Sequence, residues 1–189
     1  MRVLLLAPPG AGKGTQGARL ADHLGVSHIA AGDLLREQQR LGTPLGGQVR
    51  AIMAHGDLVP DDLMLGLVFG AIDGARNGFV LDGFPRTVAQ AHAARRIARQ
   101  RGLLAQLAIH LVVTDEEVVR RLLARGQGRP DDTECVITRR LALYHEVAAP
   151  LLDFYQDRGL LVEIDGMPPI DRVTEAIFSV VDAARARSA

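Results

Sequence analysis

Residues 7–15 read Ala-Pro-Pro-Gly-Ala-Gly-Lys-Gly-Thr, and this stretch decides the fold. An apolar run, residues 2–6, precedes it, and an amphipathic run that includes Leu20 and Leu24 follows it. A strand, a glycine-rich loop that contains Gly-Lys and a helix form the context of a phosphate-binding loop, or P-loop. The alternative is a generic glycine-rich turn that only joins a strand to a helix.

The loop residues suit phosphate for a direct physical reason. Gly10, Gly12 and Gly14 lack a Cβ atom, so the backbone can curl and point successive N–H groups inward. The helix N-terminus adds partial positive charge, and Lys13 can reach terminal phosphate oxygens. The strict pattern G-x-x-x-x-G-K-[ST] is not met, because Ala7 takes the place of the first glycine and a further glycine precedes the hydroxyl residue. We expect a negative φ at Ala7, since a positive φ is disfavoured for alanine.

Lys13 is unusual because it is the single lysine among 22 basic residues, the other 21 being arginines. A bias toward arginine codons explains the lack of lysine elsewhere, but it leaves the exception unexplained. The lysine ammonium is a compact charge on a flexible stem, whereas arginine is a planar fork. Lys13 is therefore a candidate for a position that needs the compact group.

Composition excludes several classes of protein. The chain has 189 residues, of which 48% are hydrophobic, and this predicts one domain with a sizeable core. One cysteine, Cys135, excludes an internal disulfide and a multi-cysteine zinc site. The 22 acidic residues balance the 22 basic ones, so no net charge recruits nucleic acid. No apolar run has the length of a membrane span or a secretory leader, and we expect a cytoplasmic protein.

Five short apolar runs predict strands. They are residues 2–6, residues 79–82, residues 107–113, residues 160–164 and a shorter run around His28 and Ile29. Continuous apolar strands separated by helices favour an α/β fold: a doubly wound, five-stranded parallel sheet with helices on both faces.

Several patterns predict where helices begin. Thr114 and Glu117 match a capping box, in which each side chain satisfies a free amide of the other residue. Pro44 and Pro60 fit first-turn positions. A long helix is predicted from Thr133 to about residue 157, interrupted or bent near Pro150.

The order Pro-Gly-Ala-Gly-Lys-Gly-Thr-Gln at residues 9–16 resembles the adenylate kinase family of nucleoside monophosphate kinases. Further segments are similar to the family in the same order. Residues 31–36, Ala-Gly-Asp-Leu-Leu-Arg, look like its acceptor-binding segment, and residues 56–61 like the segment that lines the acceptor base. Residues 78–87, Gly-Phe-Val-Leu-Asp-Gly-Phe-Pro-Arg-Thr, resemble its most specific signature.

Three side chains near that signature also fit from their chemistry. Asp82 ends a buried strand, at the sheet edge where doubly wound folds bind ligands, and it suits a Mg²⁺ shell through water together with Thr15. Arg86 opens the next helix and can grip phosphate oxygens, with Gln90 one turn further on the same face. The Gln90 amide offers a donor and an acceptor, which suits an adenine edge. The alternatives are a surface ion pair for Asp82 and Arg86 and a solvated helix residue for Gln90.

The second half of the chain is rich in arginine. By resemblance, Arg121, Arg125, Arg129 and Arg140 grip the phosphoryl group and the donor nucleotide, although such a density of arginine is also typical of a solvated helix face. We assign Arg120 and Arg139 to solvent.

The resemblance implies two nucleotide sites and a set of catalytic residues. The predicted ATP-binding residues are Gly10, Ala11, Gly12, Lys13, Gly14, Thr15, Arg121, Arg125 and Gly166. The predicted AMP-binding residues are Ala31, Arg36, Asp57, Leu58, Val59, Gly83, Phe84, Pro85, Arg86, Gln90, Arg129 and Arg140. The predicted catalytic residues are Lys13, Asp82, Arg86, Arg121, Arg129 and Arg140.

The resemblance also implies an organisation and a reaction. Residues 1–189 form one P-loop kinase domain, with an acceptor subdomain at about residues 30–59 and a short lid at about residues 125–133, without zinc. The expected reaction is ATP + AMP = 2 ADP with Mg²⁺, carried out by a monomer that binds neither nucleic acid nor membrane. Ala30 and Ala31 differ from the Ser-Thr usual in adenylate kinases, and an alanine at the second position is more like the uridylate and cytidylate kinases, whereas Gln90 favours adenine. A regulatory module that binds nucleotides without turnover is a second alternative.

Overall fold

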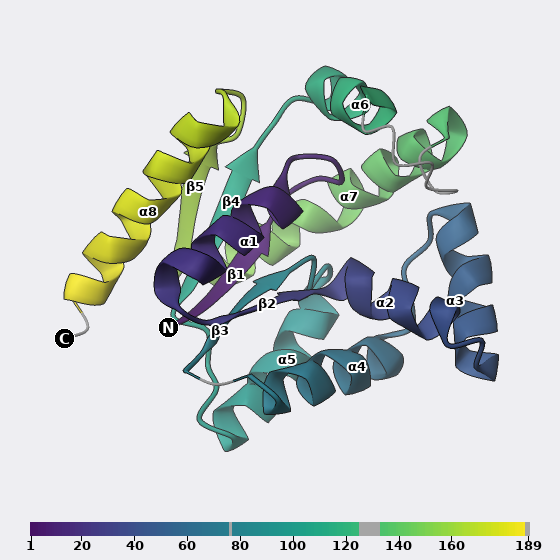
Figure 1. The fold of residues 1–189 in the computed structure, drawn as a ribbon, viewed down its shortest axis with the longest axis horizontal. Helices are drawn as coiled ribbons and strands as arrows, with labels where there is room; N and C mark the ends of the chain where they lie inside the picture. The colour runs from purple at the N-terminus through teal and green to yellow at the C-terminus, as the bar shows by residue number, and fades with distance from the viewer. Residues whose placement is uncertain (76, 125–132, 188–189) are drawn as a thin grey trace.

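The computed structural model describes residues 1–75, 77–124 and 133–187, and it contains one five-stranded parallel sheet (Figure 1). The strands are β1 (Arg2–Leu6), β2 (Ser27–Ala30), β3 (Phe79–Asp82), β4 (Leu107–Val112) and β5 (Leu161–Asp165). Their order across the sheet is β2-β3-β1-β4-β5, and each neighbouring pair is parallel. The predicted α/β class and all five predicted strands are confirmed, with end shifts of one or two residues.

Eight helices connect and cover the strands in the described part of the chain. They are α1 (Lys13–Leu24), α2 (Ala31–Arg40), α3 (Pro44–His55), α4 (Asp61–Asp73), α5 (Val88–Gln100), α6 (Asp115–Ala124), α7 (Glu134–Gln156) and α8 (Ile170–Ala186). None of these helices combines the length and the apolar composition that crossing a membrane requires.

The alternating side chains of the strands build a separate core on each face of the sheet. On one face, Val3 and Leu5 of β1 pack with Leu20 of α1 and Ile177 of α8. In Figure 1, α1 and α8 lie side by side in front of the sheet. The opposite face contributes to a core that includes side chains of α2, α4, α5 and α7 and extends to Val49 of α3, which packs on α2. Because both faces are covered at the centre of the sheet, residues 3–6 of β1 and residues 79–81 of β3 are apolar and buried, whereas the edge strand β5 exposes Glu163 and Asp165.

Three predictions about helix ends were wrong in detail. Pro60 is the N-cap of α4 and not its first helical residue. Helix α7 includes Pro150 and runs from Glu134 to Gln156, so the predicted interruption is absent, and the predicted bend stays a prediction. The capping box at α6 forms only in part: the hydroxyl of Thr114 accepts a hydrogen bond from the Glu117 amide at 3.4 Å, but the Glu117 carboxylate turns to arginines on its own helix.

Candidate active site

The glycine-rich loop joins the central strand to the first helix. Gly10 and Gly12 have φ values of 81° and 95°, a left-handed conformation that glycine adopts at little cost. Gly12 is the N-cap of α1, and Lys13 is the first helical residue. Asn77 is the one described non-glycine residue with a positive φ, so the prediction of a negative φ at Ala7 is confirmed.

Lys13 is more enclosed than its sequence context suggested. Although it follows a glycine-rich loop, Lys13 is the first residue of α1 and is half-buried. Its Nζ atom donates hydrogen bonds to the carbonyl oxygens of Ala7 at 2.9 Å and Pro8 at 2.8 Å. The ammonium group is therefore hydrogen-bonded to the backbone at the start of the glycine-rich loop.

A cavity of about 580 Å³ opens beside this loop, at the carboxyl ends of β1, β2 and β3. Charged side chains from separate parts of the chain line it: Lys13 of α1, Arg36 of α2, Arg86 from the segment after β3, and Arg140 of α7. Asp82, the last residue of β3, lines the same cavity. The structure thus brings together four cations and two carboxylates, Asp33 and Asp82, from positions that lie up to 127 residues apart in the sequence, from Lys13 to Arg140.

A smaller cavity of about 60 Å³ adjoins the first and shares Arg36, Arg86 and Arg140 with it. Residues 56–59 and Gln90 line its other side. These are the residues that the sequence assigned to the acceptor nucleotide. The three shared arginines therefore lie where the two cavities meet.

Gln90 lies at the start of α5 and is only 1% exposed. Its Oε1 accepts a hydrogen bond from the Arg86 amide at 2.7 Å, and its Nε2 donates to Asp61 Oδ1 at 2.8 Å. The backbone N–H of Gln90 donates to the hydroxyl of Thr87, the helix N-cap, at 3.1 Å. Arg86 therefore precedes the helix, and our prediction that it shares a helix face with Gln90 was wrong.

Several arginines form ion pairs that their sequence positions did not indicate. Arg139 is exposed as predicted, and its Nε atom also donates to Asp57 Oδ1 at 2.8 Å. This ion pair joins α7 to the segment that lines the smaller cavity. Arg120 is exposed as predicted, although it forms an ion pair with Glu117. Arg36, expected at the acceptor phosphate, forms an ion pair with Asp33 within its own helix.

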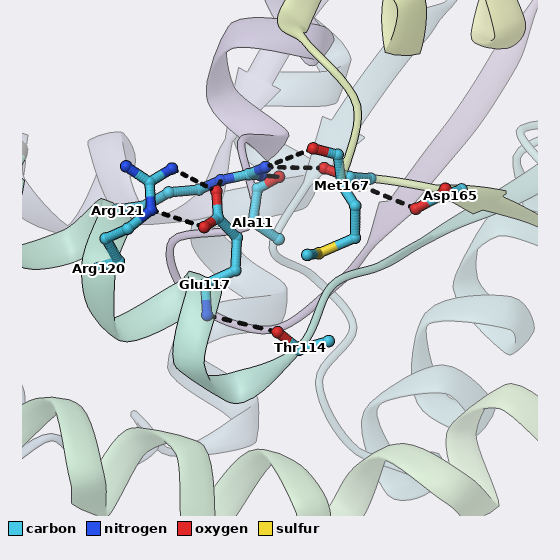
Figure 2. A network of polar contacts seen from close by, with 8 residues as sticks. Ala11, Thr114, Glu117, Arg120, Arg121, Asp165 and Met167 are labelled. Carbon is cyan, nitrogen blue, oxygen red and sulfur yellow. Dashed lines mark hydrogen bonds and ion pairs between the residues drawn. The ribbon is translucent and has the colours of Figure 1, made fainter.

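Arg121 connects three segments, as Figure 2 shows. Its Nε donates to Glu117 Oε1 at 2.6 Å, and its two Nη atoms donate to the carbonyl oxygens of Ala11 at 3.3 Å and Gly166 at 2.9 Å. Hydrogen bonds from Arg120 and Arg121 hold the pKa of Glu117 down, at about 2. Helix α6 thereby joins the phosphate-binding loop to the loop after β5, and both loops belong to the predicted ATP site.

Asp82 is buried and has a histidine close by. His28 of β2 places its Nε2 atom 3.9 Å from Asp82 Oδ2. Among the described residues, Nε2 of His28 is a buried side-chain nitrogen with no hydrogen-bond partner. In the sequence, His28 indicates only a place in a short strand, and no local pattern indicates that it lies close to the site.

Some predicted residues lie outside the described part of the chain. Arg125, Arg129 and the predicted short lid fall within residues 125–132, which the structure does not describe, except for Thr133 at the N-cap of α7. In the described residues, no group of three histidine, cysteine, aspartate or glutamate side chains could hold a metal ion.

A P-loop at the carboxyl edge of a parallel sheet, with several arginines facing one nucleotide-sized cavity, defines a nucleotide-dependent phosphotransferase of the nucleoside monophosphate kinase class. The family model for adenylate kinase matches residues 5–160. The chain belongs to the adenylate kinase family, whose members interconvert ATP and AMP with two ADP.

Individual relatives agree over nearly the whole chain. An adenylate kinase of Nitrobacter hamburgensis is 43% identical over 97% of this chain and 93% of its own length. One from Methylobacterium nodulans is 46% identical over 94% of each chain. One from Thermobifida fusca is 45% identical over 96% of this chain and 98% of its own.

Proposed function

We propose that the chain carries out ATP + AMP = 2 ADP with Lys13, Arg36, Arg86 and Arg140 as the groups that hold the reacting phosphates. Phosphoryl transfer between two nucleotides crowds negative oxygens into one volume, and catalysis then depends on positioning and on stabilising charge. The observation that carries the proposal is the convergence of these four cations and Asp82 on one cavity.

Each residue has a role that follows from its place. Lys13 and the loop amides bind the transferred phosphoryl group from the donor side. Arg86 and Arg140 line both cavities and stabilise the charge that passes between donor and acceptor. Arg36 pairs with the acceptor phosphate after it leaves Asp33. Arg121 fixes the two loops of the donor site.

Oxygen donors suited to Mg²⁺ line the same cavity. The carboxylate of Asp82 and the hydroxyl of Thr15 both face it, and Mg²⁺ prefers such ligands while keeping several waters. We propose that these two residues hold a nucleotide-bound Mg²⁺ through water. The ion supplies charge neutralisation at the phosphate oxygens.

The acceptor specificity and the organisation of the chain follow the same proposal. Gln90 and residues 57–59 form the adenine site, within an acceptor subdomain at about residues 30–59, and residues 125–133 form the short lid that carries Arg129. Arg125 contacts the donor nucleotide. The resemblance further supports a cytoplasmic monomer that acts on free nucleotides and binds no nucleic acid.

A coupled assay with ATP, Mg²⁺ and either AMP, CMP or UMP tests the proposal. We expect AMP to give the highest kcat/KM by at least tenfold, because the Gln90 amide matches the adenine edge. Faster turnover of a pyrimidine nucleotide would instead assign the chain to the specificity that Ala31 suggested. Nucleotide binding without any turnover would support the regulatory module.

A further inference from the structure

Both ends of the Gln90 side-chain amide are hydrogen-bonded, one to a group that can only donate and the other to a group that can only accept. Its Oε1 faces the Arg86 backbone N–H, which can only donate, at 2.7 Å. Its Nε2 faces an Asp61 carboxylate oxygen, which can only accept, at 2.8 Å. The positions of the oxygen and the nitrogen are therefore determined by chemistry, and a rotation of the amide by 180° would break both hydrogen bonds.

This fixed orientation matters for the bases that the smaller cavity can accept. The amide still offers one lone pair on Oε1 and one hydrogen on Nε2. Adenine presents an amino group at position 6, which donates, beside a ring nitrogen that accepts. Hypoxanthine presents an oxygen at position 6, which accepts, beside a protonated ring nitrogen. An amide free to rotate would match either base, but an amide held in one orientation matches only one of them.

We propose that Asp61 is a positioning residue that restricts the acceptor to 6-aminopurine nucleotides by holding the Gln90 amide in one orientation. This inference rests on the proposed function, since it takes Gln90 as the group that recognises the base. Asp61 is the first residue of α4 and does not line either cavity described above. It acts on the base through Gln90 and not by direct contact.

The Asp61→Asn substitution separates the effect of hydrogen-bond polarity on the Gln90 orientation from the effect of side-chain size. The new side chain has nearly the same shape, but it can donate as well as accept, so it can rotate together with Gln90 and keep their hydrogen bond. Only the hydrogen bond to the Arg86 amide would then oppose rotation. The part of the discrimination that comes from Asp61 would be lost, while the surrounding packing stays the same.

Asp62 provides a matched control. It lies in the same first turn of α4 and carries the same charge, and like Asp61 it is exposed. Asp61→Asn and Asp62→Asn therefore change the charge near the helix N-terminus in the same way. Only Asp61 contacts Gln90.

The experiment measures kcat/KM for AMP and IMP, at fixed ATP, in the wild type and in both variants. We expect the AMP/IMP ratio to fall about tenfold in Asp61→Asn and to stay within twofold of the wild type in Asp62→Asn. The KM for AMP should rise in Asp61→Asn, while the KM for ATP and the kcat at saturating AMP change less than twofold. A merely structural role would lower activity toward both nucleotides equally.

A second variant and a binding measurement complete the test. Asp61→Ser places a hydroxyl that both donates and accepts at a helix start that tolerates serine, and the same loss of discrimination is expected. Calorimetry of AMP and IMP binding measures the role of Asp61 in base recognition without requiring turnover. If the wild type fails to turn over AMP, that result contradicts only the proposed function. An AMP/IMP ratio unchanged in both Asp61 variants would overturn the role of Asp61.

Discussion

The guanidinium group of Arg121, on α6, lies 2.9 Å from the carbonyl oxygen of Gly166, on the loop that follows β5. The same side chain reaches the phosphate-binding loop through Ala11. We expect Arg121→Met to lower kcat/KM for ATP about 100-fold, because both donor-site loops lose their common partner and the site loses a cation. Steady-state kinetics with varied ATP checks this.

The neighbouring arginine is the control for that variant. Arg120 also bonds Glu117, but its side chain is 69% exposed, against 25% for Arg121. An exposed ion pair contributes little, so Arg120→Met should change kcat/KM less than twofold. Equal losses in the two variants would show that general positive charge matters and not the bridge between the loops.

Lys13→Met should reduce kcat about 1,000-fold, because the transferred phosphoryl group loses its donor-side cation. The free energy of unfolding should also fall by about 1–2 kcal/mol, since Lys13 is half-buried and bonds two carbonyl oxygens. Lys13→Arg should be similarly inactive, because the planar fork is bulkier and less adaptable. Urea unfolding and single-turnover kinetics measure the two effects separately. An arginine variant with near wild-type kcat would contradict the need for a compact ammonium.

Two glycines of the loop should respond differently to alanine. Both have a left-handed φ, but a Cβ at Gly12 would meet nothing within 4 Å, whereas one at Gly10 would lie 2.6 Å from Cγ of Leu122. We expect Gly12→Ala to lower the free energy of unfolding by about 1–2 kcal/mol, from backbone strain alone. Gly10→Ala should cost about 1–3 kcal/mol more, because α6 must shift. Equal values from urea unfolding would argue against this close contact between the loop and α6.

A partly buried network that includes Tyr144, a residue lining the larger cavity, predicts an alkaline effect on stability. His110 bonds Tyr144 at 2.9 Å and Glu163 at 2.9 Å. Burial, together with the charges of Glu163 and Asp115, raises the pKa of Tyr144 to about 12. Between pH 10 and 12 the unfolded chain loses this proton while the folded protein keeps it, so the free energy of unfolding falls as the pH rises.

Tyr144→Phe should remove part of that dependence. The loss of stability between pH 10 and 12 should be about 1 kcal/mol smaller in the variant than in the wild type, after allowance for solvent screening. The only other tyrosine, Tyr155, also has a pKa raised by burial, and its share of the slope should remain. Identical slopes in urea unfolding series would mean that Tyr144 ionises equally well in both states.

Local patterns were enough to predict the sheet and the loop. Residues 3–6 and residues 79–81 are continuously apolar, and Gly-Lys between a strand and a helix has few other uses. The local pattern did not determine the cap at the start of α6, because the Glu117 carboxylate can accept hydrogen bonds either from the Thr114 backbone N–H or from two arginines. The charged guanidinium groups of Arg120 and Arg121 are stronger hydrogen-bond donors to the carboxylate than a backbone N–H is.

The partners of the site residues depend on tertiary contacts, which the sequence does not encode locally. Nothing near Arg139 indicates Asp57, and nothing near His28 indicates Asp82. One signal was available and was missed. Thr87 and Gln90 have the spacing of a capping box, and this would have placed Gln90 at the third position of a helix, with its side chain turned back toward the helix start, although the structure shows that Oε1 accepts from Arg86 and not from the N-cap Thr87.

The position of the Lys13 ammonium has a consequence for affinity. Its bonds to the Ala7 and Pro8 carbonyl oxygens must weaken when phosphate oxygens take their place. Nucleotide association is then an exchange of one set of oxygen acceptors for another. A measured dissociation constant would report the difference in free energy between the hydrogen bonds to phosphate and those to the two carbonyl oxygens. Substitutions that weaken the hydrogen bonds from Lys13 to the carbonyl oxygens should therefore raise the affinity for nucleotide without contacting it.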